Sequence, residues 1–170
     1  LVQAIVRDGE KIIIRDVQDD ETGERINLNV AQYIAYDLGL DNLSFSNPLS
    51  VQILSEAIEH SADEDFKAEE YFTHHPDILV STLPVKLSVD RFQLSESMQI
   101  KEREVDLRDR IMHLILDYRM DYVEQQLKEL QVSLSTESDL SKTMEIMGEI
   151  KKMQDMRNVL ARKLGNDIVV

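Results

Sequence analysis

The most regular pattern of hydrophobic positions lies in the last third of the chain. Apolar residues recur in steps of four and three between residues 116 and 134, and the same steps recur between residues 146 and 164. This spacing is typical of the a and d positions of two packed helices. The predicted seam between them comprises Leu116, Met120, Val123, Leu127, Leu130 and Leu134 on the first helix and Ile146, Ile150, Met153, Arg157, Leu160 and Leu164 on the second.

A short polar segment joins these two predicted helices. Residues 133–139 read SLSTESD, and Thr136 with Asp139 three residues later resembles a capping box that would start the second helix. Gly165 follows two cations in the last turn and is suited to end that helix. So short a connection permits only antiparallel neighbours, so we predict a long helical hairpin.

The first part of the chain predicts shorter elements. The opening stretch LVQAIVRDGE resembles the end of a helix that Gly9 would close in the left-handed conformation. The β-branched runs KIIIRDV and RINLNV are separated by turn-forming residues and predict a β-hairpin. Two strands alone are marginally stable, so this β-hairpin is expected to pack on helices.

Capping signals mark three further helices in this part. Asn29, three residues before a glutamine, predicts the start of a helix over residues 30–38 that Gly39 would end. Asn47, followed directly by a proline, predicts a helix over residues 48–60. Asp65 would open a helix over residues 66–75 that Pro76 ends. The predicted fold is therefore mainly α: a helical bundle with a small β-hairpin, followed by a long antiparallel helical hairpin.

Charge divides the chain near residue 100. Residues 1–100 carry 7 basic and 19 acidic side chains, whereas residues 101–170 carry 12 and 14. This shift predicts two domains, a helical bundle subdomain at 1–100 and a C-terminal helical hairpin subdomain at 101–170. The net charge of −14 argues against direct nucleic-acid binding, which needs clustered positive charge.

Both hairpin helices also carry apolar residues outside the seam. A second stripe runs along the first helix, and further apolar residues lie off the seam of the second. These residues are Ile111, Ile115, Tyr118 and Tyr122 on the first helix and Met144, Met147, Met156 and Val159 on the second. Either a third helix of the same core covers them or a partner protein does, and the sequence leaves both open.

The second hairpin helix is the predicted partner-binding surface. Six of the seven methionines fall between residues 112 and 156, and Met suits a surface that adapts to a partner. Residues 142–163 also hold six basic and three acidic side chains in an otherwise acidic chain. The predicted partner-binding residues are Met144, Met147, Lys151, Lys152 and Met156.

No catalytic or metal-binding pattern is found. The chain has no cysteine, which excludes disulfides and thiolate chemistry and suits the cytoplasm. His74, His75 and Asp77 lack metal-ligand spacing and are interpreted as a helix-end turn, and His60 and His113 stand apart from them. The acidic residues 63–65 are interpreted as a solvated first turn rather than a magnesium site. No phosphate-binding glycine loop or nucleophile elbow is present, so we predict neither catalysis nor a cofactor.

The remaining predictions concern polar residues near the seam, a membrane-spanning segment and the start of the chain. Arg157 in the apolar seam is expected to pair with Asp117 on the other helix, and His113 near the seam is expected to be a hydrogen-bonded helix residue. No run approaches the roughly 20 apolar residues that span a bilayer, so no membrane is predicted as a partner. The chain opens at Leu1 inside a helix-like apolar pattern, which suggests a piece of a longer protein.

Several segments together resemble the C-terminal domain of the bacterial DNA primase, most closely that of the Bacteroides group. These are INLNVAQYIAYDLGLDNLSFSNPLSVQILSEA, FKAEEYFTHHPDI, IMHLILDYRMDYVEQQLKEL and MGEIKKMQDMRNVLARKLGNDIV. The resemblance spans nearly the whole chain and lies in the order of the segments rather than in one motif. It implies a non-catalytic domain that docks on the N-terminal domain of the hexameric replicative helicase. The zinc and magnesium of the parent nucleotidyltransferase would belong to upstream domains.

Two other readings stay open. The replicative helicase's own N-terminal domain is similar in architecture to this primase domain, and a downstream ATPase domain in the full gene would identify it. A coiled-coil self-association module unrelated to replication would instead form a stable dimer without any partner.

Overall fold

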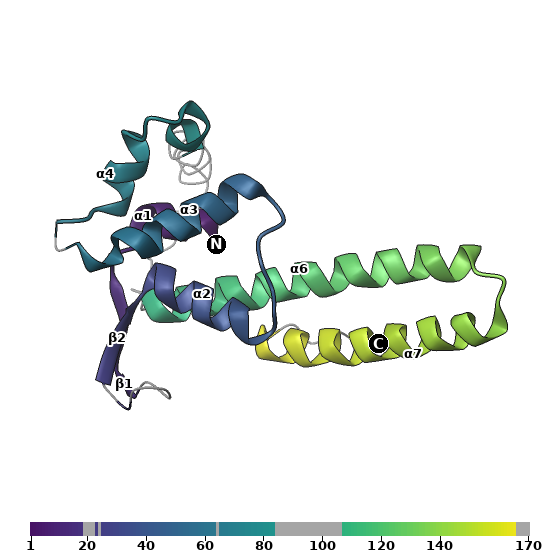
Figure 1. Cartoon of the computed structure of the whole chain (residues 1–170). Coiled ribbons are helices and arrows are strands. Elements are labelled where there is room, and N and C mark those ends of the chain that lie inside the picture. The colour runs from purple at the N-terminus through teal and green to yellow at the C-terminus, as the bar shows by residue number, and fades with distance from the viewer. Residues whose placement is uncertain (19–22, 24, 64, 84–106, 166–170) are drawn as a thin grey trace, which may run out of the picture. The chain divides into compact units, whose positions relative to one another are not determined.

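The chain is described by a computed structural model over residues 1–18, 23, 25–63, 65–83 and 107–165 (Figure 1). It forms two compact units, Leu1–Ile111 and Met112–Val170. The predicted domain boundary near residue 100 falls outside the described residues. The division between the two units lies within a helix, α6, which spans Leu107–Thr136.

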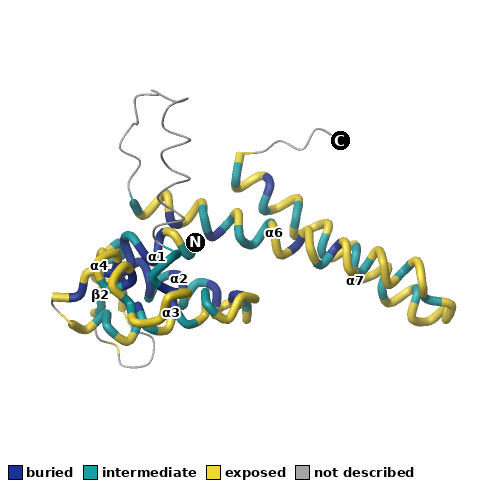
Figure 2. The backbone as a smooth tube through the Cα atoms, turned by 90° about the horizontal axis from the view of Figure 1, so that it is seen from above, coloured by how far each residue is buried: buried dark blue, intermediate teal, exposed yellow. Residues whose placement is uncertain are grey.

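The first unit is a small helical bundle with one β-hairpin. Its elements in chain order are α1 (Val2–Asp8), β1 (Ile12–Gln18), β2 (Arg25–Asn29), α2 (Val30–Leu40), α3 (Pro48–Glu59), the 3-10 turn η1 (His60–Ala62), α4 (Ala68–Thr73), a helical stretch at residues 78–83 and the first five residues of α6. Helix α1 packs against α2, α3 and α4, and α2 also contacts both strands. The core is fully buried at residues such as Ile5, Ile34, Ile53, Phe72 and Ile111 (Figure 2).

The two strands pair antiparallel, with irregular register in the middle of β1. Ile12 pairs with Asn29 and Gln18 with Arg25, but the register shifts twice between these ends. Asp16 lies in the left-handed region at φ 56°, and its backbone N–H donates to the Asn27 side-chain oxygen at 3.1 Å. This bond to β2 gives the Asp16 N–H a partner where the register shifts, and Asp tolerates the left-handed conformation better than most residues.

The predicted β-hairpin is present, and so are two of the predicted helix caps. Asn29 and Gln32 form a reciprocal capping box, with bonds of 2.9 and 3.1 Å between each side chain and the other residue's backbone N–H. Asn47 accepts from the Leu49 backbone N–H at 2.9 Å, with a proline in the first turn of α3. These caps satisfy N–H groups that a helix start leaves without partners.

Three local predictions about glycines and caps were wrong in detail. Gly9 ends α1 in the right-handed conformation, and it is glycine because a Cβ there would lie 2.4 Å from the Ile5 carbonyl oxygen. Helix α2 continues through Gly39 to Leu40, and Asn42 takes the left-handed conformation instead. Asp65 does not cap α4. That helix begins at Ala68, whose N–H donates to a carboxylate oxygen of Glu10 at 3.3 Å.

The second unit is the helical hairpin of α6 and α7 (Leu140–Lys163), which lie side by side and run antiparallel (Figure 1). Thr136 is the last residue of α6, where its hydroxyl donates back to Val132 and Ser133 carbonyls. The predicted capping box of Thr136 and Asp139 was therefore wrong: Asp139 itself caps α7, accepting from the Ser141 and Lys142 N–H groups. Gly165 follows α7 at φ 74°, as predicted for a helix stop. The predicted fold class, a mainly α chain with a small β-hairpin and a long helical hairpin, is confirmed.

Candidate docking surface

The seam of the hairpin is the less exposed side of both helices. Val123 and Leu127 are buried, and the other predicted seam residues Leu116, Met120, Leu130, Leu134, Ile146, Ile150, Met153, Arg157, Leu160 and Leu164 are half-buried. Ala161 near the end of α7 is also buried. An inner face therefore exists on each helix, and it defines which side of α7 points outward.

The outer side of α7 carries a line of exposed apolar residues. Leu140, Met144 and Met147 are 77%, 68% and 55% exposed, and Lys151 continues the same line. Their steps of 4, 3 and 4 place them on one side of a helix that turns about 100° per residue. We call Leu140, Met144, Met147 and Lys151 the outer stripe. Exposed apolar side chains grouped in this way mark an interaction site more often than scattered ones do.

The five predicted partner-binding residues do not share one line. Met144, Met147 and Lys151 belong to the outer stripe. Lys152 and Met156 form a second line four residues apart, which lies between the outer stripe and the seam. Met156 is less exposed, at 47%, than either methionine of the outer stripe. The outer stripe is therefore the part of the predicted surface that points farthest from α6.

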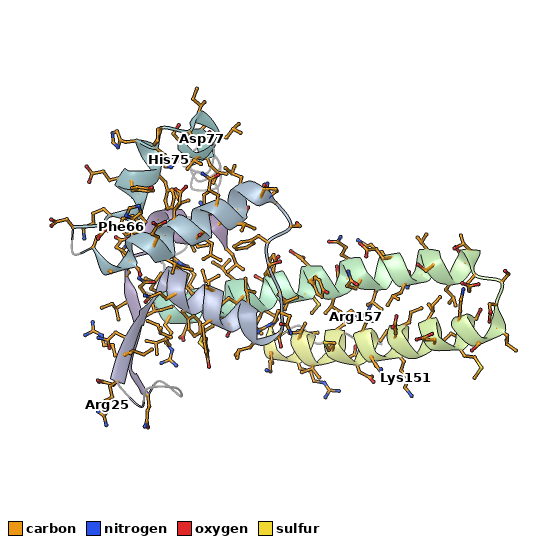
Figure 3. The ribbon with its side chains drawn as sticks, in the orientation of Figure 1. Arg25, Phe66, His75, Asp77, Lys151 and Arg157 are labelled. Atoms are coloured by element: carbon orange, nitrogen blue, oxygen red, sulfur yellow. The ribbon has the colours of Figure 1, made fainter. Side chains whose placement is uncertain are left out.

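Positive charge borders the apolar part of this surface. Lys151 and Lys152 are exposed, and Figure 3 shows Lys151 on the side of α7 away from α6. Neither lysine has an ion-pair partner among the described residues. In a chain of net charge −14, this local excess of lysine favours a partner that carries carboxylates.

Arg157 points toward α6 but does not form the predicted ion pair. No salt bridge joins it to Asp117, and its buried Nε lacks a hydrogen-bond partner. Figure 3 shows the side chain between the two helices. The prediction failed because an a/d position points at the facing helix's seam, whereas the exposed Asp117 is turned off that seam. Arg157 is a polar group placed among apolar ones.

The second stripe of α6 changes from buried to exposed along the helix. Ile111 and Ile115 are buried, Tyr118 is half-buried and Tyr122 is 40% exposed. Burial raises the pKa of the Tyr118 phenol, with a smaller contribution from Tyr122. The apolar surface of this stripe that a partner can reach is therefore confined to its end.

His75 belongs to a structural cluster in the first unit. His75 Nε2 lies 3.1 Å from a Glu56 oxygen, and His75 Nδ1 accepts the Asp77 backbone N–H at 3.1 Å. Both ring nitrogens are thus engaged, so His75 offers no free nitrogen to a metal or a substrate. Figure 3 shows His75, Asp77 and Phe66 in the first unit.

An aromatic group surrounds this Glu56 contact. Tyr71 lies between His60 and His75, with ring centroids 4.7 and 5.6 Å away, and Phe66 stacks on His60 at 5.5 Å. Burial and then the negative charge of Glu56 raise the pKa of the Tyr71 phenol. Sequence reasoning missed this cluster, because Glu56 stands 19 positions before His75 with no motif between them. Its role is packing between α3 and the segment that follows α4.

The described residues contain no group of three or more histidines, cysteines or carboxylates placed to hold a metal ion. His74 bonds the Glu70 carbonyl oxygen, and His113 is exposed on α6. A hollow of about 470 Å³ lies beside α4. Its lining mixes basic and acidic side chains, namely Arg7, Lys67 and His74 with Glu10, Glu69 and Glu70. No described helix is both long enough and apolar enough to cross a bilayer.

One family model matches the chain over residues 1–169, that of a domain of unknown function (DUF8430). The chain belongs to the DUF8430 family. Neither the curated proteins nor the solved structures include a significant match. The resemblance to the primase domain therefore stays a prediction.

For this DUF8430 chain, sequence reasoning missed two positions of the candidate surface. Leu140 is its most exposed large apolar residue, and Gly148 lies beside Met144, Lys151 and Lys152. The spacing 140, 144, 147, 151 would have revealed the first. The second is recognised only once the space around Gly148 is known.

Proposed function

We propose that this chain is the helicase-docking domain of a bacterial DNA primase, acting in the cytoplasm without a cofactor of its own. In this role it binds the N-terminal domain of the hexameric replicative helicase and couples primer synthesis to the replication fork. The observation that carries the proposal is the outer stripe of α7, an exposed apolar line next to unpaired lysines in an acidic chain.

Energetics support a binding role for this stripe. A helix presents apolar residues to water at a cost of about 25 cal/mol for each Å² that a partner could cover. Interfaces place Met and aromatic residues at their centre and charges at their rim. The outer stripe has this arrangement, with two methionines at its centre, Lys151 at one end and Lys152 beside that end.

The test replaces Met144 and Met147 together with glutamate and leaves the seam residues intact. An unpaired charge at an interface centre should weaken binding to the helicase N-terminal domain at least about thirtyfold, or about 2 kcal/mol. Isothermal titration calorimetry measures the affinity. Circular dichroism first verifies that the variant is still helical.

The matched control applies the same chemistry to the first unit. Ile78 and Leu79 are 74% and 68% exposed, so replacing both with glutamate adds equal charge on a comparably exposed apolar pair. This control should bind the helicase normally. The reverse result, in which the control loses binding and the Met144→Glu, Met147→Glu variant keeps it, would place the contact on the first unit.

A further inference from the structure

Gly148 lies in the interior of α7, where glycine weakens a helix. Relative to alanine, a glycine inside a helix costs about 1 kcal/mol, because it loses more backbone freedom on folding. Gly148 is eight residues beyond the start of α7 and fifteen before its end. End fraying or capping therefore does not account for it.

Nothing within the chain requires a glycine at this position. Its φ is not positive, unlike those of Gly23 and Gly165. A Cβ built on it would meet no atom within 4 Å, whereas a Cβ on Gly9 would collide with the Ile5 carbonyl oxygen. Alanine would thus fit at Gly148 without strain and would stabilise the helix.

The residues around Gly148 indicate that a partner, rather than this chain, needs a position without a side chain there. Met144 and Lys152 lie one turn away on either side of Gly148, and Glu145 and Lys151 lie three residues away on the same side of the helix. These four residues surround a position that has no side chain. The result is a notch in the α7 surface where another backbone can come closer than the usual 8–10 Å between helix axes.

We propose that Gly148 is the point at which an α-helix of the partner crosses α7, and that this helix carries an apolar stripe bordered by carboxylates. This inference rests on the proposed function and specifies its contact. The 4, 3, 4 spacing of the outer stripe is that of knobs that pack on a helix. The partner's carboxylates would pair with the exposed Lys151 and Lys152, which have no acidic partner among the described residues.

The first experiment compares Gly148→Ala with Gly39→Ala. Gly39 is also helical, and a Cβ there also meets nothing within 4 Å, so it is a matched control in the first unit. Gly148→Ala should raise Tm by about 2 to 4 °C. It should also weaken binding to the purified helicase N-terminal domain about tenfold, and Gly148→Leu should weaken it further, because the added atoms block close approach. Gly39→Ala should leave binding unchanged.

A second measurement tests the charge of the partner helix. Lys151→Glu should slow association with the helicase domain and reduce the dependence of affinity on salt. Lys128→Glu makes the same charge change at an exposed position of α6 and should alter both far less.

Each outcome has a distinct meaning. If the unaltered chain does not bind the helicase, the proposed function fails and this inference fails with it. If the chain binds and Gly148→Ala and Gly148→Leu bind equally well, the crossing point is wrong while the proposed function stands. A concentration-dependent dimer in sedimentation equilibrium that Gly148→Leu abolishes would overturn the partner assignment in favour of a second copy of this chain.

Discussion

Single residues show which local signals in this sequence are reliable. Asn29 and Asn47 cap helices as predicted, because a cap depends only on residues two or three positions away. Arg157 behaves differently, since its partner had to come from the facing helix. In this chain, a prediction about a single residue is reliable when its bonding partner lies a few positions away in the sequence and unreliable when the partner lies far away.

The Asn29→Ala variant tests the capping box. Asn29 is 5% exposed and takes part in two reciprocal bonds, and its partner Gln32 also donates to Ser61 at 3.0 Å. We expect a loss of about 1 to 2 kcal/mol in the free energy of unfolding by urea. Asn47→Ala removes one exposed cap bond and should cost about 0.5 kcal/mol. Equal costs for the two variants would show that the reciprocal bond adds nothing.

At the scale of elements, the spacing of apolar residues predicted more than single glycine and cap residues did. The steps of three and four gave both long helices and their less exposed faces, because many positions contribute to each period. Glycine and cap residues were less informative. Asp65 does not cap α4, since Glu10 from the segment after α1 supplies the acceptor, and no local pattern reveals a group 58 positions away. Of the outer stripe, Met144, Met147 and Lys151 were among the predicted residues, while Leu140 was not.

The seam gives the element-scale prediction. Leu127 is 5% exposed in the middle of α6, so Leu127→Ala should cost about 2 to 5 kcal/mol in the stability of the hairpin unit. Urea unfolding followed by circular dichroism at 222 nm measures this. Leu140→Ala removes the same atoms from a position that is 77% exposed and should change stability by less than about 0.5 kcal/mol. A cost below that value for Leu127→Ala would mean that the seam is not packed.

At the scale of the whole molecule, the first unit is completed by residues far along the chain. Arg110 in the first turn of α6 donates to Asp8 at 2.6 Å, and Lys11 contacts the other oxygen of the same carboxylate at 2.6 Å. Asp8 is 6% exposed, and Ile111 beside Arg110 is fully buried. The sequence could not predict this contact, because 102 positions separate the two residues and neither belongs to a motif.

Arg110→Met tests the contact while keeping the aliphatic part of the side chain. The loss of one charged partner from a buried carboxylate should lower the stability of the first unit by about 1 to 2 kcal/mol, less than for a fully buried pair because Arg110 is half-exposed. The effect should shrink in 1 M NaCl. Lys128→Met, which removes a cation at an exposed position of α6 with no ion pair among the described residues, serves as the control. A salt-insensitive loss would assign the cost to packing alone.

The Asp8–Arg110 contact also sets an order of events during synthesis. A ribosome adds about 5 to 20 residues per second and releases the amino end first. The first unit therefore stays incomplete, with its Asp8 carboxylate lacking one of its two cations, until residues 110 and 111 have emerged. Closing a loop of this length costs conformational entropy that grows with the logarithm of its length, so it is a late step. The α6–α7 hairpin needs only neighbours in sequence and can form as soon as its own residues are released.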